Sequence, residues 1–212
     1  ADTDTTTPAN IRQSVKLSVD VADLLKGEVN RLRFNRTAGE GMLYYTAHMR
    51  VNLPVELVEA ESRGITVERQ YTIVGGDGTP VTEAKVGDTI RVTLTIILPS
   101  DQHYIVINDP IPAGTEAINP NLATSTVGEP PNLRLDNPFR DGWGWWWFSE
   151  TELRDDRTVL YATYLPKGTY KYTYTVRAGM AGTFKVIPTT GEAFYTPEVY
   201  GRSSGSLFTI KP

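Results

Sequence analysis

The sequence contains no cysteine, and that absence removes several kinds of chemistry. Without a thiol, the chain of 212 residues cannot form a disulfide framework, a thiolate zinc site or a cysteine nucleophile. Histidine is also scarce, because only His48 and His103 occur, and their spacing is not that of a metal-binding pair. We therefore predict no metal site and no cofactor.

A basic excess and a long apolar run are missing as well. Lys and Arg number 21 against 25 Asp and Glu, so the formal net charge is −4, which argues against a surface for nucleic acid. No apolar run approaches the roughly 20 residues that span a bilayer, so we predict no transmembrane segment. Residues 1–10, ADTDTTTPAN, have neither the basic start nor the apolar stretch of a signal peptide, and we interpret them as a linker. That interpretation favours a piece of a longer protein.

The residue patterns of common catalytic sites are largely missing. The chain has no Gly-x-Ser-x-Gly motif, and Gly75-Gly76-Asp77-Gly78 lacks the Lys-Ser/Thr of a phosphate-binding loop, so it indicates a turn. Asp155 and Asp156 are compatible with a glycosidase carboxylate or a calcium ligand, but the arginines on both sides favour an ion-paired turn. We predict a protein that is not an enzyme, the weaker alternative being a hydrolase that uses Asp155 or Asp156 as an acid.

Strand patterns, by contrast, fill the sequence. Residues 88–98, DTIRVTLTIIL, alternate apolar and polar side chains, and residues 169–177, TYKYTYTVR, alternate in the same way, as half-buried antiparallel strands do. Pro166-Lys167-Gly168 is predicted to close a tight hairpin, and the Pro- and Asn-rich segment 110–141 is predicted to be a long loop. Many short strands separated by turns predict an all-β antiparallel sandwich. The further β-rich runs are 42–51, 65–74, 158–165 and 182–187.

All four tryptophans lie within the short segment 143–147, which ends next to Phe148. If the segment is extended, alternate rings face opposite ways, so one set can enter the core and the other needs a different cover. Three interpretations stay open: a core strand, a docking surface for another protein, and a stacking platform for sugar rings. The candidate residues of this aromatic docking surface are Trp143, Trp145, Trp146 and Trp147.

The C-terminal third carries a series of short motifs. They are LRDDRTVLYA at 153–162, LPKGTY at 165–170 and the closing run EAFYTPEVYGRS at 192–203, with GITVERQY upstream at 64–71. Together they resemble the last macroglobulin-like domain of the bacterial α2-macroglobulins, although Phe194 stands where that family's pattern has Met. The resemblance implies a macroglobulin- or immunoglobulin-like sandwich over 53–212. The alternation in residues 11–52 predicts three further strands, at 13–19, 29–35 and 42–51, and the resemblance implies that they are the later strands of a CUB-like β domain.

The same resemblance implies a function. In that family a Cys-Gln thioester captures an attacking protease after a bait region is cut, and a chain without cysteine does not contain that thioester. The chain would then be a non-catalytic domain that packs against the thioester domain of the same parent chain and shields it until bait cleavage. Tyr195 or Tyr200 would be the shielding side chain, with Glu198 and Arg202 as further interdomain contacts.

The resemblance also implies the partners and the location of the parent protein. The trapped partners would be proteases, and the compartment would be periplasmic or extracellular. A rival interpretation from another class is a carbohydrate-binding sandwich that uses the aromatic run 143–148.

Overall fold

The computed structural model describes residues 19–24, 27–35, 38–40, 42, 44, 52–118, 132–135, 148 and 150–212. The chain divides into two compact units, Ala1–Arg50 and Val51–Pro212. In the first unit, the described residues include a short 3-10 turn, η1 (Val21–Asp23). The strand predicted over 29–35 is absent, and the side chains there are exposed. Alternation alone does not make a strand, because a small isolated set of strands is marginally stable. The strands predicted over 13–19 and 42–51 lie almost entirely outside the described residues.

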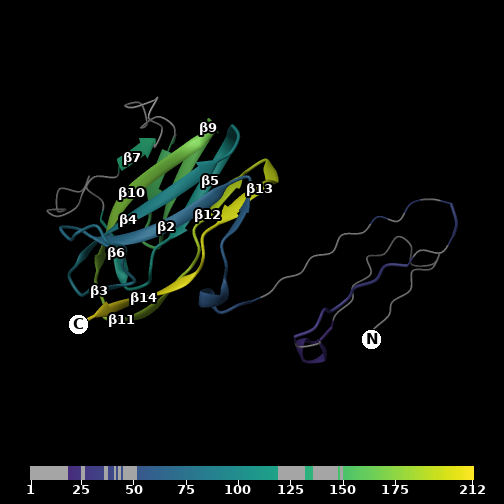
Figure 1. The fold of residues 1–212 in the computed structure, drawn as a ribbon, viewed down its shortest axis with the longest axis horizontal. Helices are drawn as coiled ribbons and strands as arrows, with labels where there is room; N and C mark the ends of the chain where they lie inside the picture. Colours follow the sequence, from purple (N-terminus) through teal and green to yellow (C-terminus); the bar gives the residue numbers. More distant parts are fainter. Residues whose placement is uncertain are drawn as a thin grey trace. The chain divides into compact units, whose positions relative to one another are not determined.

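The second unit is built from three β-sheets (Figure 1). The first has the strand order β1-β13-β12-β5-β9-β8, the second has β2-β4-β10-β6 with β7 also paired to β10, and the third has β11-β14-β3. The strands are β1 (Glu61–Arg63), β2 (Thr66–Ile73), β3 (Glu83–Lys85), β4 (Thr89–Leu98), β5 (Gln102–Pro110), β6 (Thr115–Ala117), β7 (Asn132–Leu135), β8 (Glu150–Leu153), β9 (Arg157–Leu165), β10 (Gly168–Ala178), β11 (Gly182–Val186), β12 (Thr190–Ala193), β13 (Thr196–Arg202) and β14 (Ser206–Lys211). A 3-10 turn, η2 (Val55–Leu57), precedes them. The prediction of an all-β fold is confirmed.

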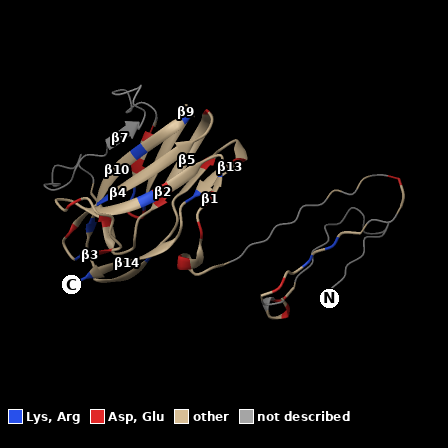
Figure 2. Ribbon diagram, in the orientation of Figure 1, with Lys and Arg blue, Asp and Glu red and all other residues tan. Residues whose placement is uncertain are grey.

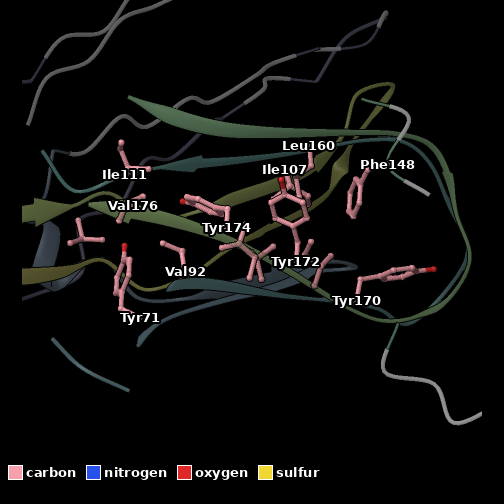
Figure 3. Packing of buried hydrophobic residues seen from close by; sticks show 14 of the residues in the cluster. Tyr71, Val92, Ile107, Ile111, Phe148, Leu160, Tyr170, Tyr172, Tyr174 and Val176 are labelled. Carbon is pink, nitrogen blue, oxygen red and sulfur yellow. The ribbon is translucent and has the colours of Figure 1, made fainter. Parts of the chain in front are cut away.

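The alternating pattern of the sequence becomes the inner face of the second sheet. In β4 the buried positions are every second residue from Ile90 to Leu98, and in β10 Tyr170, Tyr172 and Tyr174 are buried. These two strands pair over their whole length, with Tyr172 opposite Leu94 and Tyr174 opposite Val92. Their rings and branched side chains form the core together with residues of the first sheet (Figure 3). Burying such a side chain contributes about 1.5–3 kcal/mol relative to leaving it exposed.

The turn at Pro166-Lys167-Gly168 does not close a hairpin, contrary to the prediction. It connects β9, which belongs to the first sheet, to β10, which belongs to the second. The chain crosses between the sheets in the same way after β4, because β5 lies in the first sheet. Asp101 ties the two crossings together: its carboxylate accepts a hydrogen bond from Lys167 N at 2.9 Å and another from Tyr164 OH at 2.7 Å. A Pro-x-Gly turn fixes a reversal of the chain, but long-range pairing decides which sheet each strand joins.

The segment 110–141 is also more regular than predicted, because it contains β6 and β7. Both short strands pair with β10 on the edge that β4 leaves open. Elements of three or four residues are too short to show a periodic pattern, so the sequence could not identify them.

Lys and Arg on the one hand and Asp and Glu on the other are spread over the second unit without separating into a positive and a negative region (Figure 2). Among the described residues, no helix is long and apolar enough to cross a bilayer.

Candidate functional site

A buried charged network connects the two large sheets of the second unit. Arg69 on β2 and Asp109 on β5 form an ion pair with 2.5 Å between Nη1 and Oδ1, and their side chains are 3% and 0% exposed. The same Nη1 donates to the Pro110 carbonyl at 3.0 Å, and Nη2 donates to the Ile187 carbonyl at 2.8 Å. The guanidinium also lies over the ring of Tyr71, 5.5 Å from its centre. The guanidinium of Arg69 therefore has three acceptors, one carboxylate and two backbone carbonyls.

Two hydroxyl groups complete the set of donors around Asp109. Tyr174 OH donates to Oδ2 at 2.6 Å, and Thr189 Oγ1 donates to Oδ1 at 2.7 Å. Burial raises the pKa of Tyr174, and the neighbouring carboxylate raises it further, so the hydroxyl stays protonated and donates a hydrogen bond to Asp109. Burial alone would lower the pKa of Arg69, but the charge of Asp109, the neighbouring Tyr71 and Tyr174 and the hydrogen bond to Asp109 together outweigh burial and raise it. Each oxygen of the buried carboxylate accepts at least one hydrogen bond from the network, so the network acts as a structural tie between the two sheets.

The network continues from Thr189 into the hairpin of β12 and β13. Thr189 N donates to Ser203 Oγ at 2.9 Å, and Ser203 N donates back to the Thr189 carbonyl at 2.9 Å. Next to this pair, Gly201 lies so close to Ile65, the residue just before β2, that an added Cβ would be 2.0 Å from the Ile65 carbonyl oxygen. Arg202 Nε donates to the Glu59 carbonyl at 3.0 Å. The Gly-Arg-Ser run therefore fixes one end of the hairpin.

The other end of the hairpin carries an exposed aromatic turn. Phe194 and Tyr195 connect β12 to β13, and their side chains are 66% and 72% exposed. Their rings meet edge to face at 5.1 Å. Phe194 N donates to the Tyr104 carbonyl at 2.9 Å, and the ring of Tyr104 meets that of Tyr195 at 5.0 Å and 90°. One backbone bond and one ring contact thus hold the turn against β5.

The aromatic surface extends beyond the turn. His103 lies beside Tyr104, with 6.4 Å between ring centres, and its ring is 4.8 Å from that of Tyr164 on β9. All of these side chains are exposed. We call Phe194, Tyr195, Tyr104, His103 and Tyr164 the aromatic row. Rings with a polar edge and an apolar face are typical of surfaces that bind another protein.

The structure separates the residues that the resemblance grouped together. Tyr195 lies in the aromatic row, whereas Tyr200 is half-buried in β13 opposite Glu192 and Arg63. Glu198 is exposed on the same strand. Arg202 ends β13, about 20 Å along the strand from the turn. Besides its bond to Glu59, it forms an ion pair of 3.4 Å with Glu61, so it braces β1.

The remaining candidates have simpler surroundings. Asp156 pairs with Arg157 at 2.7 Å, in an exposed turn that Arg154 N closes by donating to the Arg157 carbonyl at 2.8 Å, which confirms the predicted ion-paired turn. The described residues contain no group of three or more His, Cys, Asp or Glu that could hold a metal ion. Trp143, Trp145, Trp146 and Trp147 lie outside the described residues. Phe148 is buried and packs edge to face on Tyr172 at 6.4 Å (Figure 3).

Sequence reasoning did not single out Tyr104, Asp109 or Arg69 as site residues. A signal for the two charged residues was present, because both stand at inward positions of alternating strands. Asp109 follows Ile105 and Ile107 at steps of two, and Arg69 lies between Val67 and Tyr71. A charge at an inward position predicts a buried partner. No local pattern marks Tyr104.

Comparison with known proteins gives a consistent result. The family model described as the bacterial alpha-2-macroglobulin MG10 domain matches residues 64–198. The alpha-2-macroglobulin homolog of Yersinia pestis is 26% identical over 202 residues, which are 88% of this chain and 10% of that protein. The homolog of Nostoc sp. is 30% identical over 125 residues, which are 59% of this chain and 6% of that protein. A protein of Dictyostelium discoideum named circularly permutated Ras protein 2 is 24% identical over 173 residues, which are 78% of this chain and 4% of that protein.

Solved structures show the same fold. The native conformation of Escherichia coli alpha-2-macroglobulin superposes with a TM-score of 0.59 at 20% identity, over 76% of this chain and 10% of that one. Salmonella alpha-2-macroglobulin reacted with methylamine gives a TM-score of 0.56 at 22% identity, over 73% of this chain and 10% of that one. The chain thus spans a tenth or less of the length of the curated relatives described above.

Proposed function

Because the chain belongs to the bacterial alpha-2-macroglobulin family, whose MG10 domain occupies residues 64–198, we propose that residues 51–212 cover the thioester domain of their parent protein. The family consists of protease-trapping proteins. The domain would contribute no catalytic group of its own. Its role is to dock on the thioester domain and to keep water and amines away from the thioester until a protease has cut the bait region.

The exposed aromatic turn carries this proposal. Tyr195 is 72% exposed although it is an aromatic residue, and its backbone turn is held by the bond between Phe194 N and the Tyr104 carbonyl. A ring on a fixed turn can cover a reactive bond and exclude water, while its hydroxyl finds a hydrogen-bond partner at the edge of the interface. We assign the shielding role to Tyr195 rather than to the half-buried Tyr200. Glu198 and Tyr200 would lie nearer the rim, and Arg202 would act only through β1.

The partners follow from the parent protein. A solved structure of the Escherichia coli relative is described as trypsin-activated, and the Salmonella structure as reacted with methylamine. We infer that the parent of this chain is likewise activated by proteases, that it reacts with small amines, and that it acts in the periplasm or outside the cell.

The test measures the reactivity of the thioester in the full-length parent protein without any protease. Replacing Tyr195 by alanine should accelerate methylamine incorporation by roughly tenfold or more, because the shielding ring is lost. Tyr195→Phe should keep most of the protection, since the ring remains. Tyr44→Ala is the matched control, because Tyr44 is also highly exposed, at 83%, but lies in the other unit. Unchanged incorporation rates in both Tyr195→Ala and Tyr200→Ala would refute the shielding function.

A further inference from the structure

Tyr104 has a backbone conformation that side chains rarely adopt. Its φ is 54°, and it is the one non-glycine residue with a positive φ in the part of the chain that the structure describes. For a bulky residue this left-handed region is an outlier, since the Cβ approaches its own backbone. Such strain persists only where the surroundings impose it, and it concentrates at functional sites.

The left-handed residue changes the direction of the neighbouring side chains. In the rest of β5 the alternate residues Ile105, Ile107 and Asp109 are buried. Continued alternation would bury His103 as well, but His103 and Tyr104 are both exposed. The pairing with β9 is interrupted at the same place, because pairs form at His103 and at Ile105 but not at Tyr104. The kink therefore places two consecutive rings on the surface.

Both rings make the contacts that build the aromatic row. His103 meets Tyr164, and Tyr104 meets Tyr195. The kink also presents the Tyr104 carbonyl to Phe194 N, one residue beyond the last pair of β5 with β12 at Ile105 and Ala193. Tyr104 thus holds both residues of the aromatic turn: its carbonyl binds Phe194 N, and its ring contacts the ring of Tyr195.

We propose that Tyr104 is a positioning residue: its left-handed backbone turns its ring against Tyr195, and that ring orients Tyr195 for docking. The proposal rests on the proposed function in that docking is what Tyr195 is oriented for. It implies that the fold and the docking surface place different demands on this position: a residue that tolerates the left-handed region but has no ring should not weaken the fold, but it should loosen the aromatic turn and weaken protection of the thioester.

Stability and order of the turn are measured on the 212-residue chain. Asparagine tolerates the left-handed region without supplying a ring, so Tyr104→Asn should unfold at the same urea concentration as the unsubstituted chain or at a higher one. Its Tyr195 ring resonances in NMR spectra should move toward random-coil positions, whereas Tyr104→Phe should leave them in place. For the Tyr195 resonances, Tyr164→Asn is the matched control, because it removes an exposed ring of the row that has no left-handed backbone and should leave them in place; its urea midpoint is not compared, since Tyr164 also donates to Asp101. A clear loss of stability in Tyr104→Asn together with unchanged Tyr195 resonances would overturn the proposal and leave Tyr104 as an ordinary packing residue.

The functional arm uses the full-length parent protein and methylamine. Tyr104→Asn should accelerate methylamine incorporation, Tyr104→Phe should not, and the double variant with Tyr195→Ala should be no faster than Tyr195→Ala alone, because both changes remove one contact. If Tyr195→Ala accelerates incorporation but Tyr104→Asn does not, the positioning role is wrong and the shielding function stands. If Tyr195→Ala has no effect, the assignment of shielding to Tyr195 fails, and with it the role of Tyr104 in docking; the shielding function itself fails only if Tyr200→Ala has no effect either.

Discussion

Arg69 and Asp109 form an ion pair of 2.5 Å in the interior, with 3% and 0% of their side chains exposed. They are 40 residues apart in sequence and come from different sheets, so the pair joins the two layers of the sandwich. Two buried charges cost solvation energy that close pairing and extra hydrogen bonds must offset. The donors from Tyr174 and Thr189 supply those bonds.

Removing either charge of this pair should be strongly destabilising. Arg69→Met leaves the Asp109 carboxylate buried without its cation, and Asp109→Asn leaves the guanidinium without its anion, so each should cost about 3–5 kcal/mol. Urea unfolding of the 212-residue chain measures the loss. Glu83→Gln is the control, because its pair with Lys211 at 2.6 Å is exposed and should contribute no more than about 1 kcal/mol. Equal losses in the buried and the exposed pair would contradict the assignment.

Two tyrosines near the network should respond differently to the same substitution. Tyr174→Phe deletes a donor to the buried carboxylate and should cost about 1.5–3 kcal/mol. Tyr71→Phe should be nearly neutral or stabilising, because the buried Tyr71 hydroxyl has no hydrogen-bond partner among the described residues. The difference between the two urea midpoints tests the hydrogen bond directly, since both variants lose one oxygen. The reverse order would exclude the bond between Tyr174 and Asp109.

Buried tyrosines should make the second unit sensitive to alkaline pH. Burial raises the pKa of Tyr172 from its ordinary value of 10.0 to about 12. Between these two pH values the unfolded chain loses the phenolic proton of Tyr172 while the folded chain keeps it. The stabilising contribution of Tyr172 is therefore fully present below pH 10 and is lost as the pH rises through the folded pKa. Each unit of pKa difference is equivalent to about 1.4 kcal/mol. Unfolding free energies measured between pH 9 and 12 should therefore fall less steeply in Tyr172→Phe than in the unsubstituted chain, and identical slopes would count against this burial effect.

Gly201 should not tolerate even a methyl group. An added Cβ would approach the Ile65 carbonyl oxygen to 2.0 Å, and this neighbour is backbone that cannot turn away. Gly201→Ala should cost about 1–3 kcal/mol or more in urea unfolding, as strained overpacking does. Gly179→Ala is the matched control, because the nearest atom to its added Cβ would be 3.6 Å away, an ordinary contact. A stable Gly201→Ala and an unstable Gly179→Ala would contradict the close approach of β13 to the Ile65 backbone.

Several elements could be predicted from the sequence because their signals are local. The alternation in 88–98 and 169–177 predicts β4 and β10 within a residue at each end, since a half-buried strand must place every second side chain inward. The ion-paired turn at Asp156 and Arg157 was predictable for the same reason, because its partners are adjacent in the chain.

The candidate site was only partly predictable. The family motif indicated Tyr195, but nothing nearby in sequence indicated Tyr104 or its φ of 54°. The motif also grouped Arg202 with Tyr195, and the structure places them at opposite ends of β13. A motif records which residues occur together, whereas their distance depends on the path of the backbone.

The absence of cysteine is a fact that the sequence alone established, and it means that these 212 residues do not themselves contain a Cys-Gln thioester. The sequence also determined the strand periods, the all-β class and the family motifs, since each depends on residues close together in the chain. Only the tertiary structure decided that β9 and β10 lie in different sheets, that Arg69 meets Asp109, and that a strained Tyr104 holds the aromatic turn. These features depend on contacts between residues far apart in sequence, and such contacts form only when the whole core assembles.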